Sequence, residues 1–149
     1  MKFHLAIPFF FLCSIFLPPQ LSAQCGCDHI LSGLSASSVN IINASSFNYS
    51  PGDVFCVEAD TVAGLRFVGF QGSAAQPLVF KNCNGKVVVR ETTYSGIDFN
   101  NSRYVHLTGT GDTATYGFHV IETGGGAMGV NVGNLSSDAE IDQIGRAHV

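Results

Sequence analysis

Three carboxylates alternate along one short segment near the end of the chain, at Asp138, Glu140 and Asp142. Side chains two residues apart in a β-strand lie on the same face of the sheet, so a strand here would gather all three. Clustered carboxylate oxygens are the ligands that Ca²⁺ takes in proteins. The segment therefore predicts either a calcium site or an exposed polar face that keeps the strand in solution.

A second set of polar residues recurs at a nearly constant interval, at Arg66, Asp98 and Asn131, each between two apolar residues. Strand alternation would turn these side chains outward, where a polar file could hydrogen-bond sugar hydroxyls. The other interpretation is an ordinary solvated strand surface. Hydrolysis by an acid–base pair needs two carboxylates about 5–10 Å apart, and Asp98 has no second carboxylate in its file.

Two histidines, His106 and His119, each stand between apolar residues and are also expected to point outward. A histidine in such a position could act as a general base. Because the two belong to different predicted strands, we expect them on different faces. The sequence assigns no catalytic residue.

Four cysteines follow the apolar N-terminal segment, and an even number in an exported chain favours disulfides. The Cys25-Gly26-Cys27 tripeptide is too tight for an easy mutual bridge, so each of its cysteines is expected to pair elsewhere or stay free. Three connectivities remain open. A zinc site is the alternative, but the spacing matches no usual zinc motif. The residues are Cys25, Cys27, Cys56 and Cys83.

These candidates are carried by a repeated pattern of glycine, apolar, any residue, apolar. The glycines of three of the tracts lie 32 and 33 residues apart, which indicates stacked repeats. In register, Leu65, Ile97 and Val130 would lie over one another, about 4.8 Å apart. The tracts are Gly64-Leu65-Arg66-Phe67, Gly96-Ile97-Asp98-Phe99, Gly117-Phe118-His119-Val120 and Gly129-Val130-Asn131-Val132.

Three short strands per repeat predict a parallel β-helix. For the middle repeat we expect strands over 97–99, 104–107 and 118–121. Before the first repeat we expect a leading strand over 39–42. The rival fold is a β-sandwich built from antiparallel hairpins. Its best signal is Asn84-Gly85, a dipeptide typical of two-residue hairpin turns.

The chain resembles secreted bacterial right-handed parallel β-helix proteins of the pectate-lyase-like fold. The resemblance implies carbohydrate as the usual ligand class, the glycine-led sheet as the usual substrate face, and Ca²⁺ for the carboxylate cluster. It supplies no catalytic residue. It is carried by Pro51-Gly52-Asp53-Val54-Phe55-Cys56-Val57-Glu58-Ala59, Gly64-Leu65-Arg66-Phe67, Gln71 to Cys83 and Tyr104-Val105-His106-Leu107-Thr108-Gly109-Thr110-Gly111.

The two ends of the chain differ from the rest. Lys2, an apolar run and Leu21-Ser22-Ala23 predict a signal peptide cleaved before Gln24; a lipid-modified Cys25 is the weaker alternative. The run is shorter than the roughly 20 residues of a membrane-spanning helix. Residues 144–149 resemble a translated sequencing adapter, so we expect a non-native tail there.

Composition limits the function. The formal net charge of −4 argues against nucleic acid and anionic membrane surfaces as partners. The chain is predicted to be an all-β, right-handed parallel β-helix with about three coils visible, truncated at the C-terminus. We expect a signal peptide at 1–23, a cap at 24–49, incomplete coils at 50–143 and the tail at 144–149.

The expected function is an exported module that presents a sheet face to polysaccharide or a cell-surface glycan. The alternatives are the N-terminal part of a carbohydrate-active enzyme, either a lyase or a hydrolase, and an adhesin-like spacer. We expect secretion or cell-surface display, with no membrane span once the signal is removed.

Overall fold

The computed structural model describes residues 25–91, 95–111, 115–122 and 128–148. The predicted signal peptide lies outside the described residues. Within them the regular structure is β-strand, apart from one short 3-10 helix at Ala44–Ser46.

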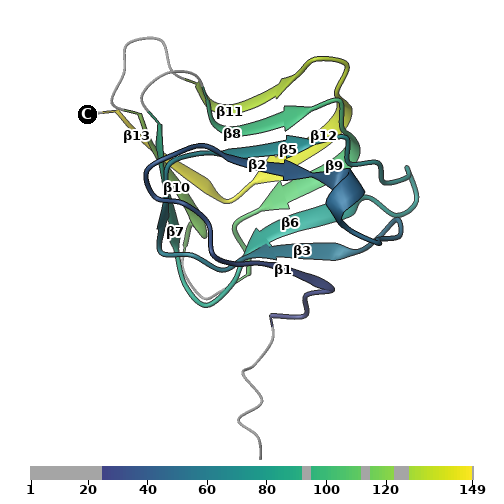
Figure 1. Cartoon of the computed structure of the whole chain (residues 1–149), viewed down its shortest axis with the longest axis horizontal. Helices are drawn as coiled ribbons and strands as arrows, with labels where there is room; N and C mark the ends of the chain where they lie inside the picture. Colours follow the sequence, from purple (N-terminus) through teal and green to yellow (C-terminus); the bar gives the residue numbers. More distant parts are fainter. Residues whose placement is uncertain (1–24, 92–94, 112–114, 123–127, 149) are drawn as a thin grey trace, which may run out of the picture.

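Thirteen strands form three sheets, shown in Figure 1. Sheet A, which we name for reference, contains β1 His29–Leu31, β3 Val54–Val57, β6 Leu78–Asn82, β9 Arg103–Thr108 and β12 Ser137–Asp142. Sheet B contains β2 Asn40–Asn43, β5 Leu65–Val68, β8 Ser95–Asn100 and β11 Met128–Gly133. Sheet C contains β4 Thr61–Val62, β7 Val87–Glu91, β10 Phe118–Glu122 and β13 Ile144–His148.

The chain visits the sheets in a fixed order, B then A then C. Four successive strand triplets result: β2-β3-β4, β5-β6-β7, β8-β9-β10 and β11-β12-β13. Each strand pairs with its counterpart in the next triplet, and all of these pairings are parallel. This arrangement is all-β and compatible with a parallel β-helix.

The hairpin that the rival sandwich fold would need at Asn84-Gly85 is not formed. The two strands that it joins, β6 and β7, belong to different sheets. Positive φ angles at Asn84 (59°) and Gly85 (119°) turn the chain from sheet A into sheet C instead. The dipeptide therefore serves a corner, and the antiparallel pairing that a hairpin-built sandwich requires is absent from the described strands.

The predicted register of the glycine-led tracts is confirmed. Ile97 pairs with both Leu65 and Val130 across sheet B. The leading glycine has a packing reason, because a Cβ at Gly96 would lie 2.3 Å from Cγ1 of Val120 in sheet C. Glycine is thus needed where the side chains of sheet C reach sheet B.

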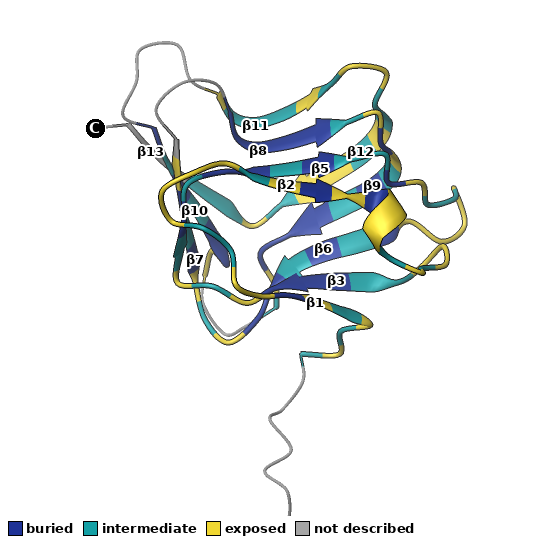
Figure 2. Cartoon of the chain, in the orientation of Figure 1, coloured by how far each residue is buried: buried dark blue, intermediate teal, exposed yellow. Residues whose placement is uncertain are grey.

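The core is a file of apolar side chains inside the three sheets, the dark blue strand positions of Figure 2. Phe67 stacks on Phe99 in sheet B, with ring centroids 5.0 Å apart. Phe55 stacks on Phe80 in sheet A at 5.1 Å. Phe67 and Phe80 meet across the interior at 4.6 Å, so the aromatic rings join the two sheets.

The segment predicted to cap the first coil contributes two paired strands. β2 continues sheet B, as the leading strand predicted over 39–42 requires, with Ile42 buried and paired with Phe67. β1 continues sheet A beside β3. At the other end of the chain, Gln143, with a φ of 54°, separates β12 from β13.

Residues of the predicted non-native tail form β13, which pairs with β10. The register places Arg146 opposite Val120, a position that Val62 and Val89 hold in the earlier strands of sheet C.

Two disulfides fix the N-terminal segment to the strands, namely Cys25–Cys83 and Cys27–Cys56. The cysteines of the Cys25-Gly26-Cys27 tripeptide therefore each pair elsewhere, one of the outcomes predicted. Two disulfides are consistent with an extracellular protein. Among the described residues, no helix is long and apolar enough to cross a membrane.

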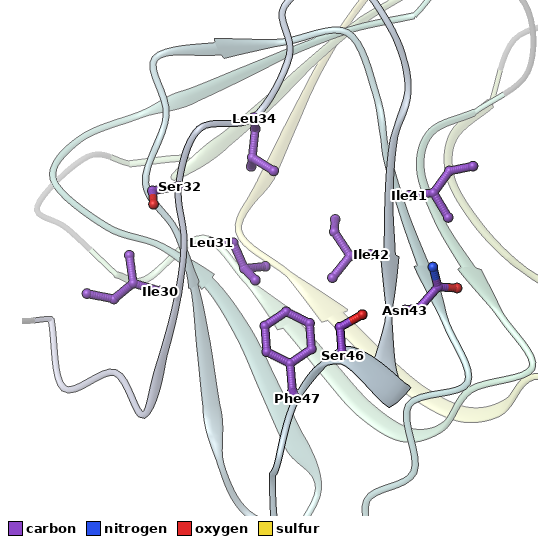
Figure 3. A pocket seen from close by; sticks show the side chains of 9 residues that line it. All are labelled: Ile30, Leu31, Ser32, Leu34, Ile41, Ile42, Asn43, Ser46 and Phe47. Carbon is purple, nitrogen blue, oxygen red and sulfur yellow. The ribbon is translucent and has the colours of Figure 1, made fainter.

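A cavity of about 290 Å³, lined by both apolar and polar side chains, opens between β1 and β2 (Figure 3). Its walls include the buried side chains of Leu31 and Ile42 and the partly buried Phe47. β1 and β2 are the outermost strands of their sheets, so this cavity lies at the N-terminal end of the stacked strands.

Candidate functional site

The outer face of sheet B brings together the three polar residues predicted to form one file. Arg66 pairs with Asp98, and Asp98 pairs with Asn131, on three successive parallel strands. Parallel strands lie about 4.8 Å apart, so identical register positions stack directly. The predicted file is therefore present on sheet B.

The file is joined by hydrogen bonds. Nε of Arg66 donates to Oδ2 of Asp98 at 2.8 Å, and Nδ2 of Asn131 donates to Oδ1 at 2.8 Å. Asp98 is only 5% exposed because these neighbours cover it, whereas the Arg66 side chain is 37% exposed. A ligand on this face would therefore meet Arg66 and Asn131, with Asp98 holding both in place.

On the outer face of sheet A, only two of the three carboxylates predicted to cluster lie together. Glu140 and Asp142 lie together, and His106 from the neighbouring strand joins them, with ligand-type atoms all within 4.8 Å of one another. Asp138 lies elsewhere, with its Oδ2 3.8 Å from Nη2 of Arg103 and 2.7 Å from the hydroxyl of Ser137. Its φ of 53° breaks the regular strand alternation on which the prediction relied.

The register explains why His106 enters this cluster. Glu140 pairs with His106, and Asp142 pairs with Thr108. Nε2 of His106 lies 3.1 Å from Oδ2 of Asp142. The Thr108 hydroxyl and then His106 lower the pKa of Asp142, against the opposing effect of burial, so this carboxyl is ionised at neutral pH.

The cluster offers two carboxylates and one imidazole, a donor set that suits a divalent cation. Its two acids stand on one strand and its histidine on the next, and these three side chains are half-buried or exposed. His119 lies apart on sheet C, opposite Val88. The expectation that the two histidines occupy different faces is confirmed.

A second histidine–carboxylate pair was not foreseen. Nε2 of His29 lies 3.1 Å from Oδ2 of Asp53, and the His29 ring stacks on Phe55 at 4.4 Å between centroids. A backbone hydrogen bond from Ser50 and the contact with His29 lower the pKa of Asp53. His29 belongs to a three-residue strand with no periodic signal, so only the register with β3 reveals the pair.

Comparisons with protein-family models, with curated proteins and with solved structures give no match to this chain. The arrangement of strands and side chains described above is therefore the basis for functional inference.

Proposed function

We propose that the chain is part of an exported right-handed parallel β-helix protein of the pectate-lyase-like kind that binds polysaccharide on the outer face of its sheets. The observation that carries this proposal is the ladder of Arg66, Asp98 and Asn131. Its two donors, Arg66 and Asn131, lie two strand separations apart, about 9–10 Å, so they could contact a polymer at two separate points. A rigid row of this kind loses little side-chain entropy when a polymer binds.

The net charge of the chain limits the class of polysaccharide that it would bind. With a formal net charge of −4, the protein attracts neutral or cationic glycans more readily than polyanionic ones. An acidic polysaccharide would need a bridging cation, and Glu140 and Asp142 are the carboxylates that could hold Ca²⁺ for this purpose. The proposal thus predicts calcium-independent binding of neutral glycans and calcium-dependent binding of acidic ones.

Affinity electrophoresis in gels that contain a neutral glucan or polygalacturonate tests the proposal. In the neutral-glucan gel we expect retardation of the parent chain and its loss in Arg66→Gln, which removes the charge and keeps a donor for Asp98. In the polygalacturonate gel we expect retardation of the parent chain only when Ca²⁺ is added. Arg90→Gln on sheet C is the matched control and should migrate like the parent. Absence of retardation in every gel, or equal loss in both variants, would refute binding through sheet B.

A catalytic role is the second candidate, favoured by the approach of Glu140 and Asp142 to His106. A lyase or hydrolase could use the carboxylate pair and imidazole for proton transfer. Incubation with the same polysaccharides should then release new reducing ends, and His106→Gln should stop the release. Binding without any release, in the presence and absence of Ca²⁺, would leave only the binding function.

A further inference from the structure

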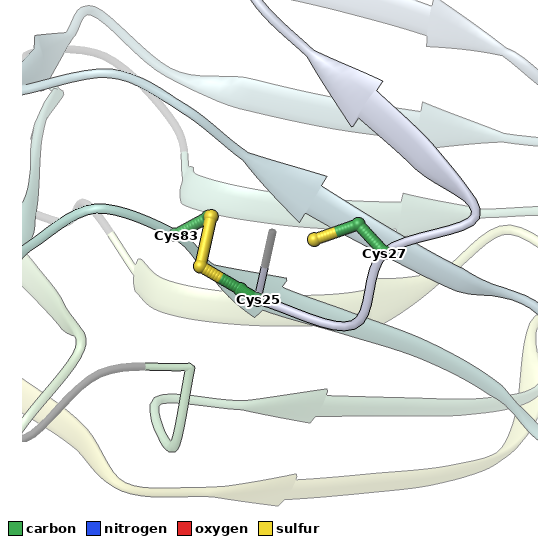
Figure 4. A group of neighbouring side chains, drawn as sticks. All are labelled: Cys25, Cys27 and Cys83. Atoms are coloured by element: carbon green, nitrogen blue, oxygen red, sulfur yellow. A yellow bond between two sulfur atoms is a disulfide. The ribbon is translucent and has the colours of Figure 1, made fainter. Parts of the chain in front are cut away.

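Three of the four cysteine sulfurs meet at one point on the outer side of sheet A. The Sγ atoms of Cys25, Cys27 and Cys83 all lie within 4.8 Å of one another. Figure 4 shows these three side chains, with Cys27 beside the Cys25–Cys83 bond, although Cys27 itself is bonded to Cys56. The sulfur of Cys27 is therefore a near neighbour of the other disulfide. This proximity is what thiol–disulfide exchange requires, since a thiolate must reach a disulfide sulfur directly.

The local fold produces the meeting. Cys56 lies in β3 and Cys83 directly follows β6, and these strands are parallel neighbours. One tripeptide therefore bridges two successive strands of the same sheet. Gly26, with a φ of 64°, makes the turn that sends the flanking cysteines to adjacent sulfurs.

In each disulfide, one cysteine is buried and the other is partly exposed. Cys56 is fully buried and Cys83 is 4% exposed, whereas Cys25 and Cys27 are half-buried. An incoming thiol thus reaches the sulfur of Cys25 or Cys27, and the departing thiolate is the one on the strand side. Such access separates exchangeable disulfides from inert ones.

A cation stands beside the tripeptide. Nζ of Lys81 lies 4.0 Å from the position that a Cβ on Gly26 would occupy. Lys81 pairs in register with Cys56, so the sheet itself delivers the ammonium to this place. A neighbouring ammonium stabilises a thiolate and makes it a better leaving group.

We propose that the Cys25-Gly26-Cys27 loop, Cys83 and Lys81 form a thiol–disulfide exchange site that reacts with low-molecular-mass thiols. The thiolate of such a thiol attacks Sγ of Cys25; a mixed disulfide forms, the Cys25–Cys83 bond breaks and Cys83 leaves as the thiolate that Lys81 stabilises. A second thiolate attacks the outer sulfur of the mixed disulfide, giving the oxidised small-molecule disulfide and the thiolate of Cys25. Two thiols are oxidised and one protein disulfide is reduced.

The third sulfur gives the site a second pairing. When Cys27 is a thiolate, it can attack Sγ of Cys83 in the Cys25–Cys83 bond. A Cys27–Cys83 bond then forms and Cys25 departs as the thiolate, with no net oxidation or reduction. Cys25 and Cys27 therefore compete for Cys83, which a purely structural pair of disulfides would not allow.

The competition is tested with Cys56→Ser, which leaves Cys27 as a free thiol beside the other disulfide. We expect disulfide mapping by mass spectrometry to find both Cys25–Cys83 and Cys27–Cys83 in the oxidised variant. Detection of Cys25–Cys83 alone, with Cys27 fully alkylated, would overturn the proposal. If the variant does not fold, the parent chain is partly reduced with glutathione, trapped by alkylation and mapped for the same two species.

The role of Lys81 is tested by rate. Reduction of the parent chain by glutathione is followed by trapping and mass measurement, and Lys81→Gln should react about two- to fivefold more slowly, the size expected for one partly solvated charge. Arg90→Gln, which removes a positive charge on sheet C, should react at the parent rate. Equal rates for the parent and Lys81→Gln would show that the Lys81 ammonium takes no part in the exchange reaction.

Discussion

Asp98 shows how a single residue links the stability of sheet B to its candidate binding face. Its carboxylate accepts hydrogen bonds from strands on both sides, and its side chain is almost covered. The arginine in this ladder is partly solvated, so the ion pair is weaker than a fully buried one. The main contribution of Asp98 is therefore to hold two neighbouring donors in fixed positions.

Replacement of Asp98 by alanine should lower the free energy of unfolding by about 1–2 kcal/mol, because two hydrogen bonds to a charged group are lost. Urea unfolding followed by circular dichroism measures the change. Asp60→Ala is the control and should cost less than about 0.5 kcal/mol, since that carboxylate is exposed. Similar costs for the two variants would show that the ladder adds no stability.

Two aspartates make the free energy of unfolding depend on pH in the acidic range. The pKa values of Asp53 and Asp142 are lowered in the folded chain, the first mainly by the Ser50 backbone and the second mainly by Thr108. A lowered folded-state pKa adds stability that is complete above the unfolded-state pKa and is lost as pH falls through the folded value. We therefore expect stability to decline below about pH 4.

Urea midpoints measured from neutral pH down to acid should show this decline. The double variant Asp53→Asn with Asp142→Asn should have a flatter profile than the parent below about pH 4. The two profiles would run parallel if these carboxyls titrated normally in the folded chain.

Gly96 governs packing at the scale of the strands. A Cβ there would lie 2.3 Å from Cγ1 of Val120 and 3.1 Å from the carbonyl oxygen of Gly129. Gly96→Ala should therefore destabilise the chain by about 1–3 kcal/mol through overpacking between sheets B and C. Thermal unfolding measures the loss.

Val120→Ala in the same chain removes the closest atom and provides the control for Gly96→Ala. The double variant should lose less stability than the sum of the two single variants, because the added methyl occupies space that the valine vacates. Simple additivity would mean that the two positions do not touch.

The strands that the sequence predicted correctly are those that recur. Leu65, Ile97 and Val130 could be aligned because stacking of equivalent strands imposes the same pattern on each repeat. β1 and β4 were missed because they span three and two residues, too few for a periodic signal. Their place in the sheets comes from pairing with β3 and β7.

The candidate sites were predictable to the extent that they depend on register. The file of Arg66, Asp98 and Asn131 follows from the alignment of repeats, but its closure into a ladder depends on side-chain distances. Asp138 lies apart from the other two carboxylates because its φ is positive, and no local sequence motif predicts that conformation. The disulfide pairing and the position of Lys81 depend on which strands become neighbours, which composition and spacing leave undetermined.

At the scale of the molecule, the stacked sheets have two open ends. β11, β12 and β13 are the last strands of their sheets, and each has an outer edge that no described strand covers. Ile141 pairs with the core residue Leu107 yet is 41% exposed, because no described strand lies over it. Val132 is 36% exposed over Phe99 for the same reason.

Unpaired parallel strands that carry exposed core side chains favour association with other strands. We therefore expect the chain of 149 residues to be marginally stable and to self-associate as its concentration rises. Sedimentation velocity over a range of concentrations measures this association. A cooperatively melting monomer at every concentration would show that the open ends are not adhesive.

Ile141→Lys should reduce the association, because a charge placed on this end opposes the approach of a second sheet edge. The substitution should cost little stability, since the side chain is already partly solvated. Val88→Lys, on the outer face of sheet C opposite His119, is the matched control. It adds the same charge away from the ends and should leave the association unchanged. If both lysines suppressed association equally, net charge alone would explain the effect and the open ends would not be its cause.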